Sequence, residues 1–145
     1  MVNGTVTFRN NEIVNVANGM FIGSDGVRLY NNVFYDAGTA FNIYLFAAYD
    51  VQSINNAVCW TNGSVRGISG SGGTISNNFT GSGASAGFVS LPTGSGGATN
   101  HVSITNAGDF RLKAGSPLMG TGTSLSPAFP NRDGVARPRW NIGAY

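Results

Sequence analysis

The chain has 145 residues, of which 41% are apolar and 10% are charged, and its formal net charge is +2. This length suits one domain with enough apolar residues to bury a core, and the small charge does not favour nucleic acid as a partner. Cys59 is the single cysteine, which excludes an intramolecular disulfide and a cysteine-based metal cluster, and no apolar run is long enough for a transmembrane helix.

Residues 2–91 contain a repeat that is marked by the dipeptide Asn-Asn. The dipeptide occurs at intervals of 21, 24 and 22 residues, at Asn10-Asn11, Asn31-Asn32, Asn55-Asn56 and Asn77-Asn78. A fixed period of this size is typical of repeat architectures. Aligning the repeats on this dipeptide therefore shows which residues of successive repeats are equivalent.

Each repeat predicts three short strands that are separated by turns. Apolar and polar residues alternate before each Asn pair, as in Val6 and Phe8 or Val27 and Leu29, which is typical of a strand. A second apolar segment follows the pair, and a third comes later in the repeat. Three short strands cannot bury an apolar face alone, but stacked coils can. We therefore expect an all-β fold, a parallel β-helix solenoid of about four coils that lie about 4.8 Å apart.

In such a fold the Asn pairs form columns. An asparagine tolerates the left-handed backbone conformation that a tight bend requires, and its amide can bond to equivalent amides above and below. Either member of each pair could point inward. We favour the second member as the structural ladder, which comprises Asn11, Asn32, Asn56 and Asn78.

The C-terminal part of the sequence is not repetitive. Residues 70–100 are rich in Gly and Ser, and the last full coil ends near Leu91. Because a solenoid needs a terminal cap over its core, we interpret residues 92–145 as a loop and an irregular C-terminal cap. The whole chain, 1–145, is then a single domain with its coils in residues 1–91.

Several motifs of this C-terminal part resemble the end of many bacterial secreted β-helix proteins. They are Phe88-Val-Ser-Leu-Pro92, Asp109-Phe-Arg-Leu-Lys-Ala-Gly-Ser-Pro117, Gly120-Thr-Gly-Thr123, Asp133-Gly, Arg137-Pro138 and Ile142-Gly-Ala-Tyr145. With the Asn-Asn coils, they make the chain similar to the right-handed parallel β-helix superfamily, the pectate-lyase-like group. The resemblance implies a right-handed β-helix, and the family is usually secreted or on the cell surface, although no signal peptide is visible in this chain.

Family members usually have more coils and an N-terminal cap, whereas this sequence begins directly in a repeat. An uncovered first coil would expose apolar side chains and strand edges. We therefore expect another copy of the chain to cover it, most simply in a two-fold homodimer or another homo-oligomer.

Two groups of residues are candidates for ligand binding. Arg9, Arg28, Tyr30 and Gln52 lie at outward positions of the first strand, where they could bind carboxylates or sugar rings or could form an ordinary solvated face. Tyr44, Tyr49 and Trp60 belong to or follow the long second repeat. Exposed aromatic side chains stack on sugars and anchor interfaces, but about half of them should pack inward.

Catalytic signals are sparse. A lyase of the resembled family would need clustered aspartates for Ca²⁺ and a basic proton acceptor, and no such cluster is visible. Asp25 and Asp50 precede equivalent strands and could form a stacked carboxylate pair or simply support turns. The function expected is therefore a non-catalytic module for carbohydrate binding or assembly, with polysaccharide or a second copy as partner. The alternative is a polysaccharide lyase or glycoside hydrolase, or its inactive remnant, acting on an acidic polysaccharide. No metal, cofactor, nucleic acid or membrane partner is expected.

Overall fold

The structure is a computed structural model that describes residues 4–14, 20–22, 25–35, 43–45, 50–60, 68–70, 73–94 and 104–145. Strands dominate these residues, and the helix among them is the short α1 (Gly83–Ala86). In the part of the chain described, no helix is long and apolar enough to cross a membrane. The prediction of an all-β fold is confirmed.

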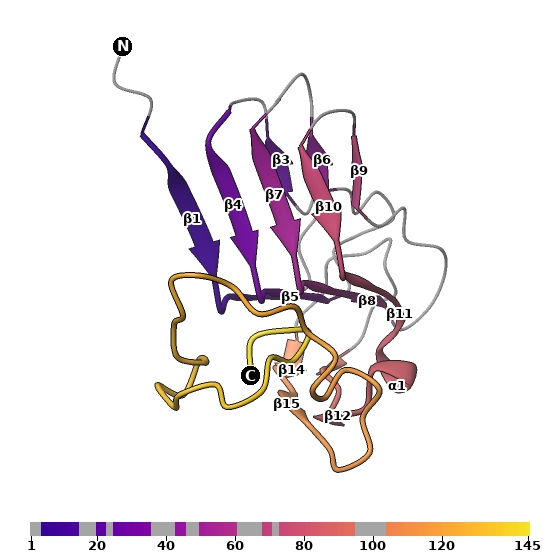
Figure 1. Cartoon of the computed structure of the whole chain (residues 1–145). Coiled ribbons are helices and arrows are strands. Elements are labelled where there is room, and N and C mark those ends of the chain that lie inside the picture. The colour runs from indigo at the N-terminus through magenta and orange to yellow at the C-terminus, as the bar shows by residue number, and fades with distance from the viewer. Residues whose placement is uncertain are drawn as a thin grey trace.

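Three parallel sheets hold the equivalent strands of successive repeats (Figure 1). The first sheet has the order β1 (Val6–Arg9), β4 (Val27–Tyr30), β7 (Val51–Ile54) and β10 (Thr74–Ser76). The second contains β2 (Glu12–Val14), β5 (Val33–Tyr35), β8 (Ala57–Trp60) and β11 (Phe79–Ser82). The third contains β3 (Met20–Ile22), β6 (Ile43–Leu45) and β9 (Ile68–Gly70). Each strand thus pairs with its counterpart in the next repeat.

The register follows the interval set by the Asn pairs. Val27 pairs with Val51, and Leu29 pairs with Ser53, and all four side chains are buried. Arg28 and Tyr30, which alternate with them, are only partly buried. Because successive side chains of a strand point to opposite faces, the apolar positions line the interior and the polar positions form an outer face. The predicted stacking of equivalent residues is therefore confirmed for the first sheet.

Each Asn pair lies at the bend between a strand of the first sheet and a strand of the second. The first member has a left-handed backbone, with φ of 56° at Asn10, 53° at Asn31, 61° at Asn55 and 51° at Asn77. Asparagine adopts this conformation more readily than most residues because its short polar side chain can bond locally. The predicted role of the pair in a tight bend is confirmed.

The C-terminal part begins with two short antiparallel pairs. β12 (Phe88–Ser90) pairs with β15 (Asp109–Leu112), and β13 (Thr93–Gly94) pairs with β14 (Ile104–Asn106). Residues 113–145 follow without a strand or helix. In Figure 1 this orange to yellow segment runs beside the second sheet and the bends of the first.

The outer side of the second sheet and the C-terminal part share one hydrophobic core. Tyr35 of β5 contacts Phe110 of β15, with ring centroids 5.4 Å apart, and Phe110 contacts Phe88 at 5.1 Å. Other members of this core are Val33, Ala57, Cys59, Ala86, Leu118, Ile142 and Ala144. The C-terminal part therefore packs against one side of the second sheet. The alternating pattern missed this because β5 is buried on both faces.

Candidate functional site

The outer face of the first sheet carries two columns of side chains. In one column Thr7 pairs with Arg28, Arg28 with Gln52, and Gln52 with Thr74. In the other, Arg9 pairs with Tyr30, Tyr30 with Ile54, and Ile54 with Ser76. Both columns agree with the stacking predicted from the Asn pairs. Three of the candidate binding residues, Arg28, Tyr30 and Gln52, are thus neighbours.

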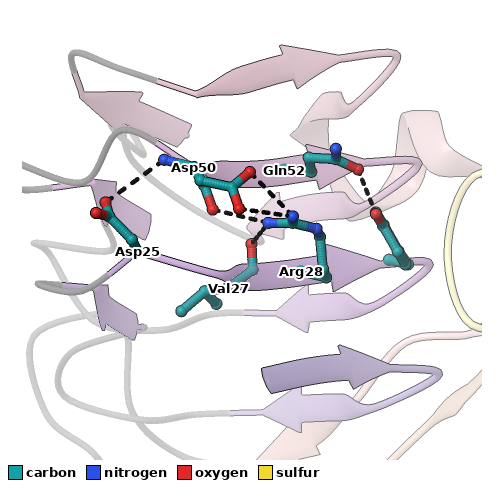
Figure 2. Close-up of polar contacts among 6 residues, drawn as sticks. Asp25, Val27, Arg28, Asp50 and Gln52 are labelled. Atoms are coloured by element: carbon teal, nitrogen blue, oxygen red, sulfur yellow. Dashed lines mark hydrogen bonds and ion pairs between the residues drawn. The ribbon is translucent and has the colours of Figure 1, made fainter. Parts of the chain in front are cut away.

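Arg28 is held by Asp50, which lies just before β7 (Figure 2). Its Nη2 donates to both carboxylate oxygens of Asp50 at 2.9 Å, and its Nη1 donates to the Asp50 carbonyl at 2.7 Å. The Arg28 side chain is only 16% exposed, whereas that of Asp50 is 62% exposed. Because two nitrogens of the guanidinium bond to the side chain and the backbone of Asp50, its plane is defined, and the carboxylate neutralises its charge.

Tyr30 and Gln52 continue the polar network across two strands. The hydroxyl of Tyr30 donates to Oε1 of Gln52. Burial raises the pKa of Tyr30 above its ordinary value, and Asp50 raises it further, while Arg28 has the opposite effect. The Tyr30 hydroxyl therefore stays protonated at neutral pH and can act as a hydrogen-bond donor.

Phe129 of the C-terminal segment contacts both Arg9 and Tyr30 of the second column. Its ring stacks on that of Tyr30 at a centroid distance of 6.4 Å, and the guanidinium carbon of Arg9 lies 4.7 Å from its centroid. Arg9 is thus engaged in a cation–π contact at one side of the network. In the other column Thr7 and Thr74 are exposed, and Arg28 and Gln52 are partly buried.

Of the three aromatic candidates Tyr44, Tyr49 and Trp60, the structure describes the side chain of Trp60 alone. Tyr49 lies outside the described residues, and so does the side chain of Tyr44, whose backbone belongs to β6. Trp60 ends β8, where it is partly buried and pairs with Ser82 of β11. The predicted aromatic binding region therefore stays a prediction.

The acidic residues described are mostly paired with arginine. Asp109 is bound by Arg111, and Glu12 lies 3.3 Å from Nη2 of Arg132. Asp25 and Asp50 lie at successive bends, where the Asp50 N–H donates to Oδ1 of Asp25 at 3.5 Å (Figure 2). Among the residues described, no group of three or more His, Cys, Asp or Glu is arranged to hold a metal ion.

The second member of each Asn pair forms a continuous hydrogen-bonded column. The backbone N–H and Nδ2 of Asn11 donate to Oδ1 of Asn32 at 3.0 and 2.9 Å, and Asn32 does the same to Asn56. Asn56 donates to Asn78 at 2.8 and 2.9 Å. Nδ2 of the last three also donates to the backbone carbonyls of Phe8, Leu29 and Ser53. These buried contacts resemble an asparagine ladder.

The first member of each pair binds the C-terminal segment, which the sequence did not indicate. Asn10 and Asn31 donate to the carbonyls of Pro130 and Asn141, at 2.8 and 2.7 Å. The equivalent bonds of Asn55 and Asn77 reach Thr123 and Thr121, at 2.8 and 2.7 Å. One side chain from every repeat thus fixes the segment along the row of bends. The repetition of the pair was visible in the sequence, but the irregular partner was not.

A shallow hollow of about 370 Å³ lies within the C-terminal segment, lined by residues that include Met119, Arg137, Arg139 and Tyr145. Arg137 is already engaged there, since it donates to the carbonyls of Ala144 and Tyr145 and to Oδ1 of Asn10. Burial lowers its pKa to about 10. These contacts connect the segment to the first bend and give Arg137 a structural role.

Tyr145 is expected to titrate later than an ordinary tyrosine. Burial, followed by hydrogen bonding to Glu12, raises its pKa to about 12. Because the folded-state value exceeds the ordinary value of 10, its contribution to stability is full below pH 10 and lost between pH 10 and about 12. The difference in phenolate absorbance between the wild type and Tyr145→Phe should show this late step. Glu12→Gln should bring it to lower pH, and an unchanged titration in that variant would contradict the role of Glu12.

The candidate site is therefore a fixed polar network on an otherwise ordinary sheet face. Its groups can donate and accept hydrogen bonds, but both oxygens of Asp50 are engaged by Arg28. Comparison with protein-family models, with curated proteins and with solved structures gives no match.

Proposed function

We propose that this chain is a non-catalytic carbohydrate-binding module whose binding surface is the column of Thr7, Arg28, Gln52 and Thr74. The proposal rests on one observation, the hydrogen-bonded network that joins Arg28 to Asp50 and Gln52 to Tyr30. Such fixed polar groups reduce the ordering cost of binding a flexible polymer.

The architecture that fits this role is a right-handed parallel β-helix of the pectate-lyase-like superfamily. In its support, equivalent strands of four repeats pair in parallel, and the Asn pairs recur at one bend. The coils would occupy residues 1–91, and residues 92–145 would pack against them as one domain. Stacked strands present equivalent side chains about 4.8 Å apart, so a polymer could lie across several coils.

The charge of the network favours an uncharged polysaccharide. Arg28 and Asp50 neutralise each other, so neither charge is available to select an oppositely charged sugar. Planar amide, guanidinium and carboxylate groups can instead bond to pairs of sugar hydroxyls. A neutral, hydroxyl-rich polymer is therefore the ligand class that this surface suits best.

We expect Gln52→Ala to weaken binding of such a polysaccharide about tenfold, which corresponds to about 1.4 kcal/mol. The variant removes a ligand-facing amide and leaves the Tyr30 hydroxyl without its acceptor. A glycan array would first identify the polymer, and titration calorimetry would then compare the two proteins. Asp50→Asn should weaken binding similarly, because it loosens Arg28.

Arg111→Gln is the matched control. It breaks an exposed arginine–aspartate pair on β15, away from the first sheet, and should leave affinity unchanged. The proposal fails if no polysaccharide binds, or if the control weakens binding as much as Gln52→Ala does.

The second candidate is a polysaccharide lyase or glycoside hydrolase that acts on an acidic polysaccharide. The observation in its favour is the closeness of Asp25 and Asp50 at successive bends, beside Arg28. Two nearby carboxylates are the usual requirement for glycoside hydrolysis. Release of reducing ends or unsaturated products by the wild type, abolished in both Asp25→Asn and Asp50→Asn, would replace the binding proposal with this one.

A further inference from the structure

The asparagine ladder has a direction. At each step the backbone N–H and Nδ2 of one asparagine donate to Oδ1 of the asparagine in the following repeat. Between ladder asparagines the donors therefore face the later repeat and the Oδ1 acceptor faces the earlier one, while Nδ2 of Asn32, Asn56 and Asn78 also donates back to a carbonyl of the earlier repeat. A column built in this way has unpaired acceptors at one end and unpaired donors at the other.

The two ends of the ladder are complementary. Oδ1 of Asn11 accepts no hydrogen bond from any residue that the structure describes, whereas Oδ1 of Asn32, Asn56 and Asn78 each accepts two. At the other end, the backbone N–H of Asn78 has no acceptor among the described residues, and its Nδ2 donates only to Ser53. One end thus offers acceptors and the other offers donors, in the geometry that each internal step already uses.

Apolar side chains are exposed at the same two ends. The inward column of the first sheet runs through Phe8, Leu29, Ser53 and Ile75. Leu29 and Ser53 are fully buried, but Phe8 and Ile75, which end the column, are each 39% exposed, and Val6 is 52% exposed. β1 and β10 are also the outer strands of this sheet, so each has an edge with unpaired backbone groups.

We propose that copies of this chain associate head to tail, with the β10–β11 end of one copy on the β1–β2 end of the next. The contact would continue the parallel sheets and would place the Asn78 donors against Oδ1 of the neighbour's Asn11. It would also cover Phe8 with Ile75. The proposal is independent of carbohydrate binding, since none of these groups belongs to the network of Arg28 and Gln52.

A two-fold dimer through the first repeat satisfies these groups less well. A two-fold axis brings identical surfaces together, so the acceptor end of one ladder would meet the acceptor end of the other. The same axis would make the two β1 strands antiparallel, unlike every other pair in this sheet. The hydrogen-bond polarity therefore selects a heterologous contact, which can repeat and produce open chains of copies.

The test uses two variants that each block one end, Phe8→Lys and Ile75→Lys. Analytical ultracentrifugation of the wild type should show a series of species that grows with concentration, while each variant alone should be monomeric. A mixture of the two should form a dimer, because Phe8→Lys retains the donor end and Ile75→Lys retains the acceptor end. Val89→Lys, at an exposed apolar position elsewhere, should associate like the wild type.

The outcomes separate the alternatives. Association of Ile75→Lys alone, without any gain on mixing, would show a two-fold contact through β1 and overturn the proposal. A wild type that is monomeric at every concentration would overturn it as well. Thermal melting of both variants checks that they are folded, and since both positions are exposed, melting should change little.

Discussion

Replacing Asn56 with alanine should lower the free energy of unfolding by about 3 to 5 kcal/mol, because each buried polar group left without a partner costs about 1 to 3 kcal/mol. Asn56 is fully buried in the middle of the ladder. Its Nδ2 donates to the carbonyl of Leu29 and to Oδ1 of Asn78, and its Oδ1 accepts two bonds from Asn32. Alanine removes the side-chain partner of the Leu29 carbonyl and of the two Asn32 donors, while Oδ1 of Asn78 keeps only the bond from the Asn56 backbone N–H.

Urea unfolding followed by circular dichroism measures this loss. Asn106→Ala is the control, because it removes an exposed asparagine whose Oδ1 accepts from the backbone N–H of Gly108. It should cost no more than about 1 kcal/mol. Asn56→Asp adds a second test, since it keeps an acceptor for Asn32 but loses the Nδ2 donors and buries a charge. A loss below about 1 kcal/mol in both Asn56 variants would mean that the ladder contributes little to stability.

The sequence predicted the ladder because the interactions that form it repeat. Strand alternation gives the inward and outward positions within one repeat, and the spacing of the Asn pairs gives the register between repeats. The same spacing made Thr7, Arg28, Gln52 and Thr74 neighbours, which the strand pairing confirms. Local patterns are sufficient here because each repeat packs mainly on repeats next to it in the chain.

The candidate site was less predictable for the opposite reason. Arg28 was correctly placed on the outer face, but its partner Asp50 belongs to the next repeat and was interpreted as a possible catalytic or turn residue. Nothing in the sequence indicated that Arg9 and Tyr30 have a partner outside the sheet, whereas both contact the ring of Phe129, about a hundred residues later. Contacts between the repeats and an irregular segment do not recur at a fixed interval, so no sequence pattern indicates them. The sequence therefore could not predict which side chains of the outer face contact the C-terminal segment.

Asn55 connects the repeats to the irregular C-terminal segment, and we expect its replacement also to lower the free energy of unfolding substantially. Its Oδ1 accepts from the backbone N–H of Thr123, and its Nδ2 donates to the Thr123 carbonyl, both at 2.8 Å. The side chain thus satisfies both backbone groups of an irregular residue. Asn55→Gly should cost about 2 kcal/mol by removing these bonds. Asn55→Ala should cost about 1 kcal/mol more, because alanine, unlike glycine, is strained at the φ of 61°.

Comparing the two variants separates the strain of the bend from the docking of the C-terminal segment. Hydrogen exchange provides the local measurement. The Thr123 N–H should lose protection in both variants, while the Gly143 N–H, which donates to the backbone carbonyl of Asn55, should keep it. Equal stability of Asn55→Gly and Asn55→Ala would contradict the backbone argument, and unchanged protection of Thr123 would contradict the docking argument. If both the backbone and the docking arguments hold, the first asparagine of each pair has two roles. It forms the bend of its own repeat, and it positions the C-terminal segment that packs against the second sheet.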